Sequence, residues 1–420
     1  MSMSLPGRFP CDKTLSCPEF QGHWRPSRQD EEFWATSVKN EFKPSGSKIR
    51  LNCRCFPNIK ASDAIVIIPG FNEPILKYVD TVHELYDAGF SVFLYDHRGQ
   101  GLSDREPDLP REWHHNAHLD SYQDLVDDCH AFVSTLIKPT HTKVHVIGHS
   151  MGGLLAVNAV ATNPALFKGG QVVLTAPMLD SVWGSTPRFM VTKIAPTLIA
   201  LNFRQKLAPL PGGTLSWWDP DKPIDVALTH DAGRLTWYHA LRSLNPRLAS
   251  RGPTCGWIRE QLKGQDEAMY KHAENFPNPV LLFTAEHDSF VKAPAHATFA
   301  ALAPDCRRVF VPGAYHELLF EAPIYREPTL KAVIQWCQGS NEYGHRVPPV
   351  APPLVLMGED RKQPNNGAVM TSEAATQAAG NGGLVKVALS ASFLVGFFAV
   401  LLHPGSSFGR SLSSVFRRHP

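Results

Sequence analysis

Short apolar runs and amphipathic segments alternate along this chain from about residue 33 to residue 338. Continuous runs rich in Val, Ile, Leu and Phe are typical of parallel strands buried on both faces. Such runs cover residues 49–56, 64–68, 91–95, 144–147, 172–175, 280–283 and 309–311. Helical patterns cover residues 76–88, 119–136, 151–162 and 330–337. Strands alternating with helices predict an α/β fold with a doubly wound, mostly parallel sheet.

One interval interrupts this alternation. About 178–276 separates two consecutive strands and is too long for a loop, so we expect an inserted, largely helical cap. Within the cap, Met190, Ile194, Leu198 and Leu201 recur at helical spacing. They are expected to cover the sheet; an apolar tunnel or a membrane-facing lid is the alternative.

The rest of the 420 residues divides by composition. Residues 1–30 are predicted to be a flexible arm without a signal peptide, and 31–338 to be the main domain. Residues 339–383 are a Pro-rich, then small and polar linker with no assigned fold. A formal net charge of +2 gives no indication of nucleic-acid binding, and eight scattered cysteines favour a reducing compartment.

Ser150 lies between an apolar strand and an apolar helix, in the pattern Gly148-His-Ser-Met-Gly152. A serine here could simply cap the helix. Small residues on both sides, however, are what a sharp strand-to-helix turn requires when it presents a nucleophile at the carboxyl edge of the sheet. We therefore interpret Ser150 as a nucleophile and Gly148 and Gly152 as its elbow.

A serine nucleophile needs a base and a group that orients the base. Asp288 and His316 follow the next two strands in the expected order, acid before histidine. Glu286 is the alternative acid. His287 and His149 lie nearby but do not follow the final strand, so we expect packing or solvent roles for them.

Two backbone N–H groups are candidates for stabilising an oxyanion. Met151 begins the helix after Ser150, and Phe71 lies in the loop "PGFNEP" after the 64–68 strand. A purely structural turn is the alternative for that loop. His114 and His118 have helical spacing, yet no carboxylate or cysteine nearby completes a metal site, so neither a metal nor a cofactor is predicted.

Several stretches resemble the α/β-hydrolase superfamily, and within it the monoacylglycerol lipase/lysophospholipase group. They include "IIPGFNEPILKYVDTVHELYDAGFSVFLYDHRGQGLSDR", "SYQDLVDDCHAFV", "GHSMGG" and "GAYHELLFE". The cap segment "LTHDAGRLTWYHALRSLNPRLASRGPTCGWIRE" most resembles the bacterial inner-membrane lysophospholipase. The resemblance spans about residues 31–338. It implies a triad of Ser150, Asp288 and His316, oxyanion donors at Phe71 and Met151, and hydrolysis of single-chain glycerolipids without cofactor or metal.

Residues 384–403 form an apolar segment followed by the basic tail 404–420. Ten of the sixteen residues 387–402 are Leu, Val or Phe, which together favour insertion into a bilayer by about 4 kcal/mol. We expect a C-terminal transmembrane anchor with the catalytic domain in the cytosol; a helix lying on a membrane surface or docking on a partner is the alternative.

The expected function is therefore a serine hydrolase that cleaves esters of monoacyl lipids through an acyl-serine intermediate. An acyltransferase or a peptidase could use the same triad. A non-catalytic binding protein of this fold would not be expected to retain all three residues.

Overall fold

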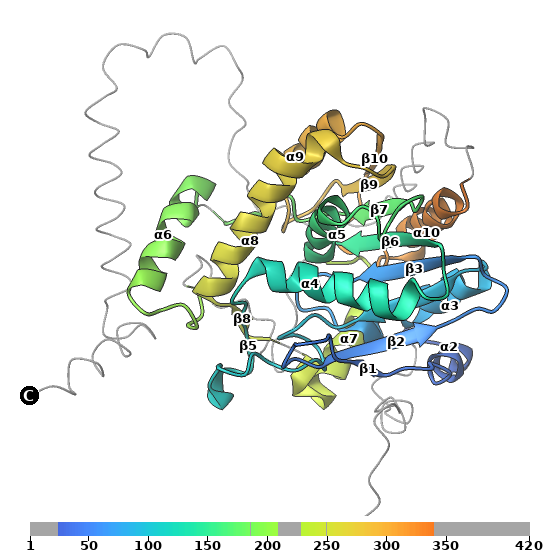
Figure 1. Cartoon of the computed structure of the whole chain (residues 1–420), viewed down its shortest axis with the longest axis horizontal. Helices are drawn as coiled ribbons and strands as arrows, with labels where there is room; N and C mark the ends of the chain where they lie inside the picture. Colours follow the sequence, from blue (N-terminus) through green and yellow to red (C-terminus); the bar gives the residue numbers. More distant parts are fainter. Residues whose placement is uncertain (1–23, 185, 209–227, 249, 340–420) are drawn as a thin grey trace, which may run out of the picture. The chain divides into compact units, whose positions relative to one another are not determined.

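The chain is described by a computed structural model that covers residues 24–184, 186–208, 228–248 and 250–339 (Figure 1). Its central sheet has the strand order β1-β2-β4-β3-β6-β7-β9-β10. The bounds are Glu41–Phe42 (β1), Leu51–Phe56 (β2), Asp63–Ile68 (β3), Ser91–Tyr95 (β4), Lys143–His149 (β6), Val172–Thr175 (β7), Val280–Ala285 (β9) and Cys306–Val311 (β10). Each predicted strand overlaps one of these, and the α/β fold with a mostly parallel sheet is confirmed.

Strand pairing brings several carboxyl ends to one edge of the sheet. β3, β4, β6, β7, β9 and β10 pair in parallel, whereas β1 and β2 are antiparallel to their neighbours. The register sets Ile68 beside Gly148 and Ala285 beside Val311. The loops that leave β3, β6, β9 and β10 therefore emerge at the same edge, where open α/β sheets bind ligands.

Side chains alternate between two cores because successive strand residues point to opposite faces. In β3, Val66 and Ile68 join the core that includes residues of α4 (Tyr122–Phe132) and α5 (Met151–Thr162). Ile65 and Ile67 join the opposite core, with residues of α3 (Val79–Asp87) and α10 (Pro323–Cys337). The strands are thus buried on both faces, which explains their uninterrupted apolar composition.

Helices also fill the interval between β7 and β9. They are α6 (Arg188–Ala200), α7 (Ala232–Leu244) and α8 (Cys255–Glu267), with short turns at Pro246–Leu248, Ala268–His272 and Ala273–Asn275. Figure 1 shows α6 and α8 next to each other at one end of the fold. A small separate sheet pairs β5 (Asn116–Ala117) with β8 (Gly252–Pro253). After β9, α9 (Ala293–Leu302) leads to β10.

The apolar face of α6 has a different phase from the predicted one. Val191, Ala195 and Leu198 are buried, whereas Leu201 is 57% exposed. α6 packs against α8, and its buried stripe is shifted by about one residue from the predicted stripe.

The N-terminal arm is shorter than predicted. The ring centroid of Trp24 lies 5.4 Å from that of Trp237 and 5.8 Å from that of Phe320, and α2 (Arg28–Trp34) begins after a Ser27 cap. Residues 24–30 therefore belong to the folded body, because aromatic packing and a capping box hold them there. Residues 1–23 lie outside the described residues.

The predicted linker from residue 340, the apolar segment 384–403 and the basic tail 404–420 also lie outside the described residues. Within the described part of the chain, no helix is long and apolar enough to cross a membrane.

Candidate active site

Ser150 occupies a strained turn between β6 and α5. Its φ is 51° and its ψ is −116°, values that side-chain-bearing residues rarely adopt. Although Ser150 stands at the N-cap position, its side chain makes no capping hydrogen bond. Backbone bonds hold the turn instead: Ser150 N–H donates to Thr175 O at 3.0 Å, and Met178 N–H donates to Ser150 O at 2.8 Å. The hydroxyl is therefore not used as a helix cap.

The two glycines beside Ser150 are required by space. A Cβ on Gly152 would lie 2.0 Å from the carbonyl oxygen of Ile68, and one on Gly148 would lie 2.6 Å from that of Gly152. Both contacts are with backbone that cannot move without shifting β3 or α5. Glycine at both positions allows the turn to pack against the end of β3.

Asp288 and His316 are joined by a short hydrogen bond. His316 Nδ1 lies 2.6 Å from Asp288 Oδ2, and both side chains are buried. Asp288 Oδ1 also accepts the backbone N–H groups of Phe290 at 2.8 Å and Val291 at 3.0 Å. The Asp288 carboxylate is thereby fixed on one side by backbone and on the other by the imidazole.

The ionisation of this pair follows from its contacts. Burial lowers the pKa of His316, but the charge and hydrogen bond of Asp288 raise it more, so the net pKa lies above its ordinary value. Burial raises the pKa of Asp288. The charge and hydrogen bond of His316, together with the N–H groups of Phe290 and Val291, lower it more, so this pKa lies below its ordinary value. The pair therefore favours a carboxylate that faces an easily protonated imidazole.

His316 lies close to the turn that carries Ser150. Its ring centroid is 4.8 Å from that of His149, the residue before Ser150, and 4.9 Å from that of Phe290. Within the described residues, no hydrogen bond joins the Ser150 hydroxyl to His316. Such bonds are often long in the absence of substrate and tighten when it binds.

The loop after β3 lies directly against Ser150. A Cβ on Gly70 would lie 3.2 Å from Ser150 Cβ. Gly70 N–H donates to Glu73 Oε2 at 2.6 Å, and Asn72, at a φ of 60°, donates its N–H to Gln100 Oε1 at 2.6 Å. Among the described residues, the backbone N–H groups of Phe71 and Met151 have no acceptor. Two free N–H groups are thus available beside the serine.

The alternative site residues lie elsewhere or are engaged elsewhere. Glu286 is exposed and accepts the Gly313 N–H at 2.7 Å, and His287 is also exposed. His114 contacts the Leu109 carbonyl at 3.0 Å, and His118 contacts the Thr254 hydroxyl at 2.8 Å. None of these four side chains contacts His316 or converges on a common ligand position in the described residues.

A buried ionic cluster lies beside the predicted site, and our sequence reasoning missed it. Lys77 pairs with Glu73 and, at 2.7 Å, with Glu317, while His149 Nε2 lies 3.4 Å from Glu317. Glu73 and Lys77 are four residues apart, and Glu317 directly follows His316, but only the fold brings the two segments together. The spacing of Glu73 and Lys77 was the one sequence signal for this cluster.

The cluster contains one lysine for two carboxyl groups. Burial and the negative charge of Glu73 raise the pKa of Glu317 to about 8. Burial also raises the pKa of Glu73, but Lys77 lowers it more, so its pKa is well below its ordinary value. Ligand atoms of Glu73, His149 and Glu317 come within 4.8 Å of one another, as in a metal site. The Lys77 ammonium already supplies the positive charge there.

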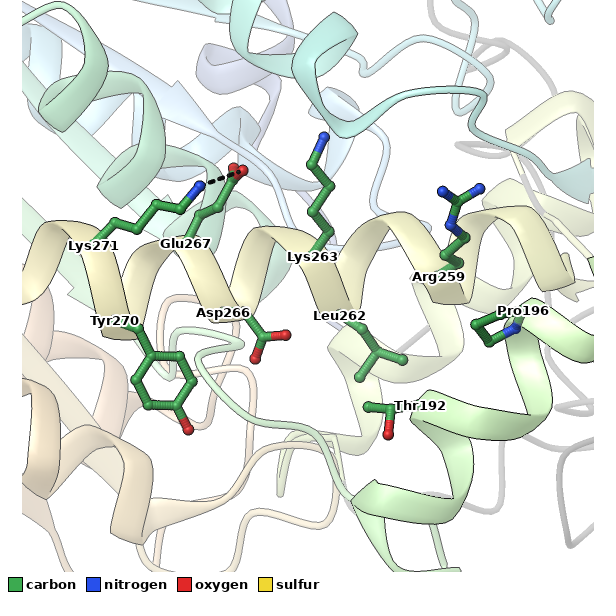
Figure 2. A pocket seen from close by; sticks show the side chains of 9 residues that line it. All are labelled: Thr192, Pro196, Arg259, Leu262, Lys263, Asp266, Glu267, Tyr270 and Lys271. Atoms are coloured by element: carbon green, nitrogen blue, oxygen red, sulfur yellow. Dashed lines mark hydrogen bonds and ion pairs between the residues drawn. The ribbon is translucent and has the colours of Figure 1, made fainter.

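A groove of about 440 Å³ lies between α6 and α8, apart from the predicted triad (Figure 2). Charged side chains of α8 line much of it, and Lys271 pairs with Glu267 across 3.3 Å. The lining residues are Thr192, Pro196, Arg259, Leu262, Lys263, Asp266, Glu267, Tyr270 and Lys271. Neither Ser150 nor His316 is among them, so this groove is not the place where Ser150 would act.

The chain is similar to known lipases in structure and in sequence. The solved monoacylglycerol lipase of Paleococcus ferrophilus matches 69% of this chain and 99% of its own, with a TM-score of 0.53 and 21% identity. Lysophospholipase L2 of Escherichia coli is 31% identical over 286 residues, which is 66% of this chain and 81% of the relative. Monoacylglycerol lipase of Mycolicibacterium smegmatis is 24% identical, over 66% of this chain and 87% of the relative.

The strand order and the structural likeness define an α/β-hydrolase fold. A family model described as serine aminopeptidase, S33 (Hydrolase_4) matches residues 59–323, which is more than half of the chain. The chain belongs to this family of hydrolases. The resemblance to the monoacylglycerol lipase/lysophospholipase group is confirmed by its relatives.

Proposed function

We propose that the chain is a serine hydrolase that cleaves the carboxylic ester of monoacyl glycerolipids. The observation that carries the proposal is the 2.6 Å bond between His316 and Asp288, beside the turn that holds Ser150. Relatives named lysophospholipase and monoacylglycerol lipase support the substrate class.

In the proposed mechanism, Ser150 Oγ attacks the ester carbonyl while His316 Nε2 accepts its proton. Asp288 holds the other ring nitrogen and stabilises the imidazolium. The negative charge that develops on the carbonyl oxygen is stabilised by the N–H groups of Phe71 and Met151, each contributing about 3 kcal/mol. His316 then protonates the departing alcohol. Water, activated by the same histidine, releases the fatty acid from Ser150.

Two other reactions could use the same groups. An acyl-serine can be transferred to an alcohol or amine instead of water, and the name of the matched family refers to peptide substrates. The curated relatives named above favour lipid esters. Product analysis separates the three: free fatty acid for a hydrolase, a new ester or amide for an acyltransferase, and released amino acids for a peptidase.

The test is hydrolysis of monoacylglycerols, lysophospholipids and triacylglycerols by the wild type and by Ser150→Ala. Wild type is expected to release fatty acid from the monoacyl lipids, and Ser150→Ala to lose on the order of 10⁶-fold in kcat. Unchanged circular dichroism and melting temperature would show that the variant is folded. Ester turnover by folded Ser150→Ala would refute the nucleophile assignment.

We also propose the domain limits. The hydrolase domain begins at residue 24 rather than at the expected residue 31 and extends to 338, with its cap at about 178–276, and 339–383 connect it to a C-terminal anchor. The helices between β7 and β9 support the cap, and the composition of residues 387–402 supports the anchor.

The anchor proposal places the enzyme on a membrane with the catalytic domain in the cytosol. The sixteen residues 387–402 carry no charge and are mostly Leu, Val or Phe, a composition that supports a helix inserted in a bilayer. A substrate dissolved in the bilayer would then be concentrated near the active site.

A further inference from the structure

A buried arginine in the cap has no counter-charge. Arg242, on α7, is 5% exposed, and its Nε, Nη1 and Nη2 have no hydrogen-bond partner. No carboxylate pairs with it among the described residues. Its guanidinium lies 5.5 Å from the ring centroid of Tyr238, one helical turn earlier.

This arrangement is costly without a ligand. An arginine remains protonated when buried, and buried charges are normally paired. Arg234, on the same helix, follows that rule, because its Nη2 donates to Asp80 at 2.7 Å. Because none of the described residues balances the charge of Arg242, we expect its partner to be a bound anion.

Tyr238 connects Arg242 to the loop that holds Phe71. The Tyr238 hydroxyl donates to the Asn72 carbonyl at 2.7 Å, so one aromatic ring separates the guanidinium from that loop. Ser250 N–H donates to Asn72 Oδ1 at 2.8 Å, and the buried Ser250 hydroxyl has no partner. Two unsatisfied polar side chains thus flank the segment that follows the proposed oxyanion donor.

Charges of both signs lie around this segment, since the buried carboxylate of Asp96 accepts the Ile75 N–H at 2.7 Å. Arg105 is hydrogen-bonded to the carbonyls of Gly101, Ser103, His114 and Arg247, and burial together with the Arg247 charge lowers its pKa. Arg247 itself contacts the Leu102 carbonyl at 3.4 Å. The nearby carboxylates Glu73 and Glu317 already face Lys77.

We propose that Arg242 binds the phosphate of a monoacyl glycerophospholipid whose ester carbonyl lies at Ser150. This inference rests on the proposed function and narrows its substrate class to lysophospholipids. A guanidinium matches phosphate geometry with two parallel hydrogen bonds. Phosphate and ester share one glycerol unit, so their binding sites must be close, and one aromatic ring separates Arg242 from the Phe71 loop.

The test compares two substrates with the same acyl chain and ester, lysophosphatidylcholine and monoacylglycerol. Arg242→Met is expected to lower kcat/KM for the phospholipid by about 10- to 100-fold and to leave monoacylglycerol hydrolysis unchanged. Arg242→Lys keeps the charge but cannot make two parallel hydrogen bonds. Its kcat/KM for the phospholipid is expected to lie between those of wild type and Arg242→Met. Arg259→Met, an exposed arginine of α8, is the matched control and should change neither rate.

The melting temperature of Arg242→Met tests the structural premise. Removal of an unpaired buried charge should leave it unchanged or raise it. A large fall, or equal losses of kcat/KM on both substrates, would overturn the inference. No change on either substrate would also overturn it. If Arg242→Met loses more kcat/KM on lysophosphatidate than on lysophosphatidylcholine, the preferred ligand is a phosphomonoester. If the two losses are equal, a phosphodiester is sufficient.

A binding measurement keeps this inference separate from the proposed function. If the wild type hydrolyses no lipid ester, the proposed function fails. Thermal shift of Ser150→Ala with glycerol 3-phosphate and with glycerol then tests Arg242 alone. We expect stabilisation by glycerol 3-phosphate only, and its loss when Arg242→Met is added; equal shifts with and without Arg242 would contradict the site.

Discussion

At the scale of single residues, the most unusual feature is the conformation of Ser150. Its φ of 51° places strain in the backbone, and the carbonyls of Ile68 and Gly152 leave no space for a Cβ at either flanking glycine. Strain of this size, about 1–3 kcal/mol, persists where the surroundings fix the turn. A serine needed only as a helix cap would not require such a turn, and its hydroxyl makes no cap here.

The bond between His316 and Asp288 predicts the pH dependence of activity. His316 must be neutral to accept a proton, and its pKa is raised above its ordinary value of 6.5 by Asp288. Esterase kcat/KM should therefore fall as pH decreases through a midpoint above 6.5. The pH profile with a soluble p-nitrophenyl ester gives that midpoint directly.

Asp288→Asn should move the midpoint to lower pH, because the charge of Asp288, which raises the pKa of His316 most, is lost. Its maximal kcat is expected to fall by about 10⁴-fold, since the imidazole loses its fixed tautomer. Glu286→Gln is the control and should leave midpoint and rate unchanged. A midpoint that stays in place in Asp288→Asn and moves in Glu286→Gln would reverse the assignment of the acid.

At the scale of elements, sequence periodicity predicted seven of the eight strands of the central sheet and missed only the two-residue β1. A buried parallel strand is an apolar run in the sequence regardless of which strands lie beside it. The residues that directly follow such strands must meet at one edge of the sheet. That reasoning predicted the proximity of Ser150, Asp288 and His316. It could not give the phase of α6 or the order of residues 24–30, because both depend on partners distant in sequence, such as α8 and Trp237.

The same limitation applies to the cluster of Lys77, Glu73 and Glu317. No local pattern indicates that residues so far apart in sequence share one ammonium group. The cluster joins the short helix Ile75–Tyr78 to the loop that carries His316. It therefore connects two segments that lie near Ser150 in space, although neither of them belongs to the turn that carries Ser150.

Replacement of Lys77 tests how strongly this cluster stabilises the fold. Lys77→Met should lower the free energy of unfolding by about 3–5 kcal/mol, because it leaves two buried carboxyl groups without a cation. Both groups would then have folded-state pKa values above the unfolded value of 4.5. Stability would be retained at low pH and lost as pH rises, so the deficit relative to wild type should be larger at pH 8 than at pH 5.

Urea denaturation at the two pH values measures this deficit. Glu73→Gln and Glu317→Gln added to Lys77→Met should recover much of the stability and remove the extra pH dependence. If Lys77→Met alone is as stable as wild type at pH 8, the ammonium is not what balances the two carboxyl groups.

At the scale of the whole molecule, the described hydrolase body has its own two cores on either face of the sheet. The lipid substrate class that we propose is poorly soluble in water and resides in membranes. Under the proposed anchor, the apolar residues 384–403 would bring the enzyme to the membrane in which such a substrate resides.

Charge placed within that segment should abolish membrane attachment without affecting catalysis. One Asp at the centre of a spanning helix costs about 2.5–3.5 kcal/mol. The combined cost of Leu394→Asp and Phe398→Asp therefore exceeds the roughly 4 kcal/mol by which the apolar residues favour insertion. In full-length protein extracted with carbonate, wild type should stay with the membranes and the double variant should be released.

Ser413→Asp with Ser414→Asp adds the same charge in the basic tail and should stay bound. All three should hydrolyse a soluble p-nitrophenyl ester equally, because the substitutions lie far along the chain from Ser150; release of the wild type itself by carbonate would contradict the anchor.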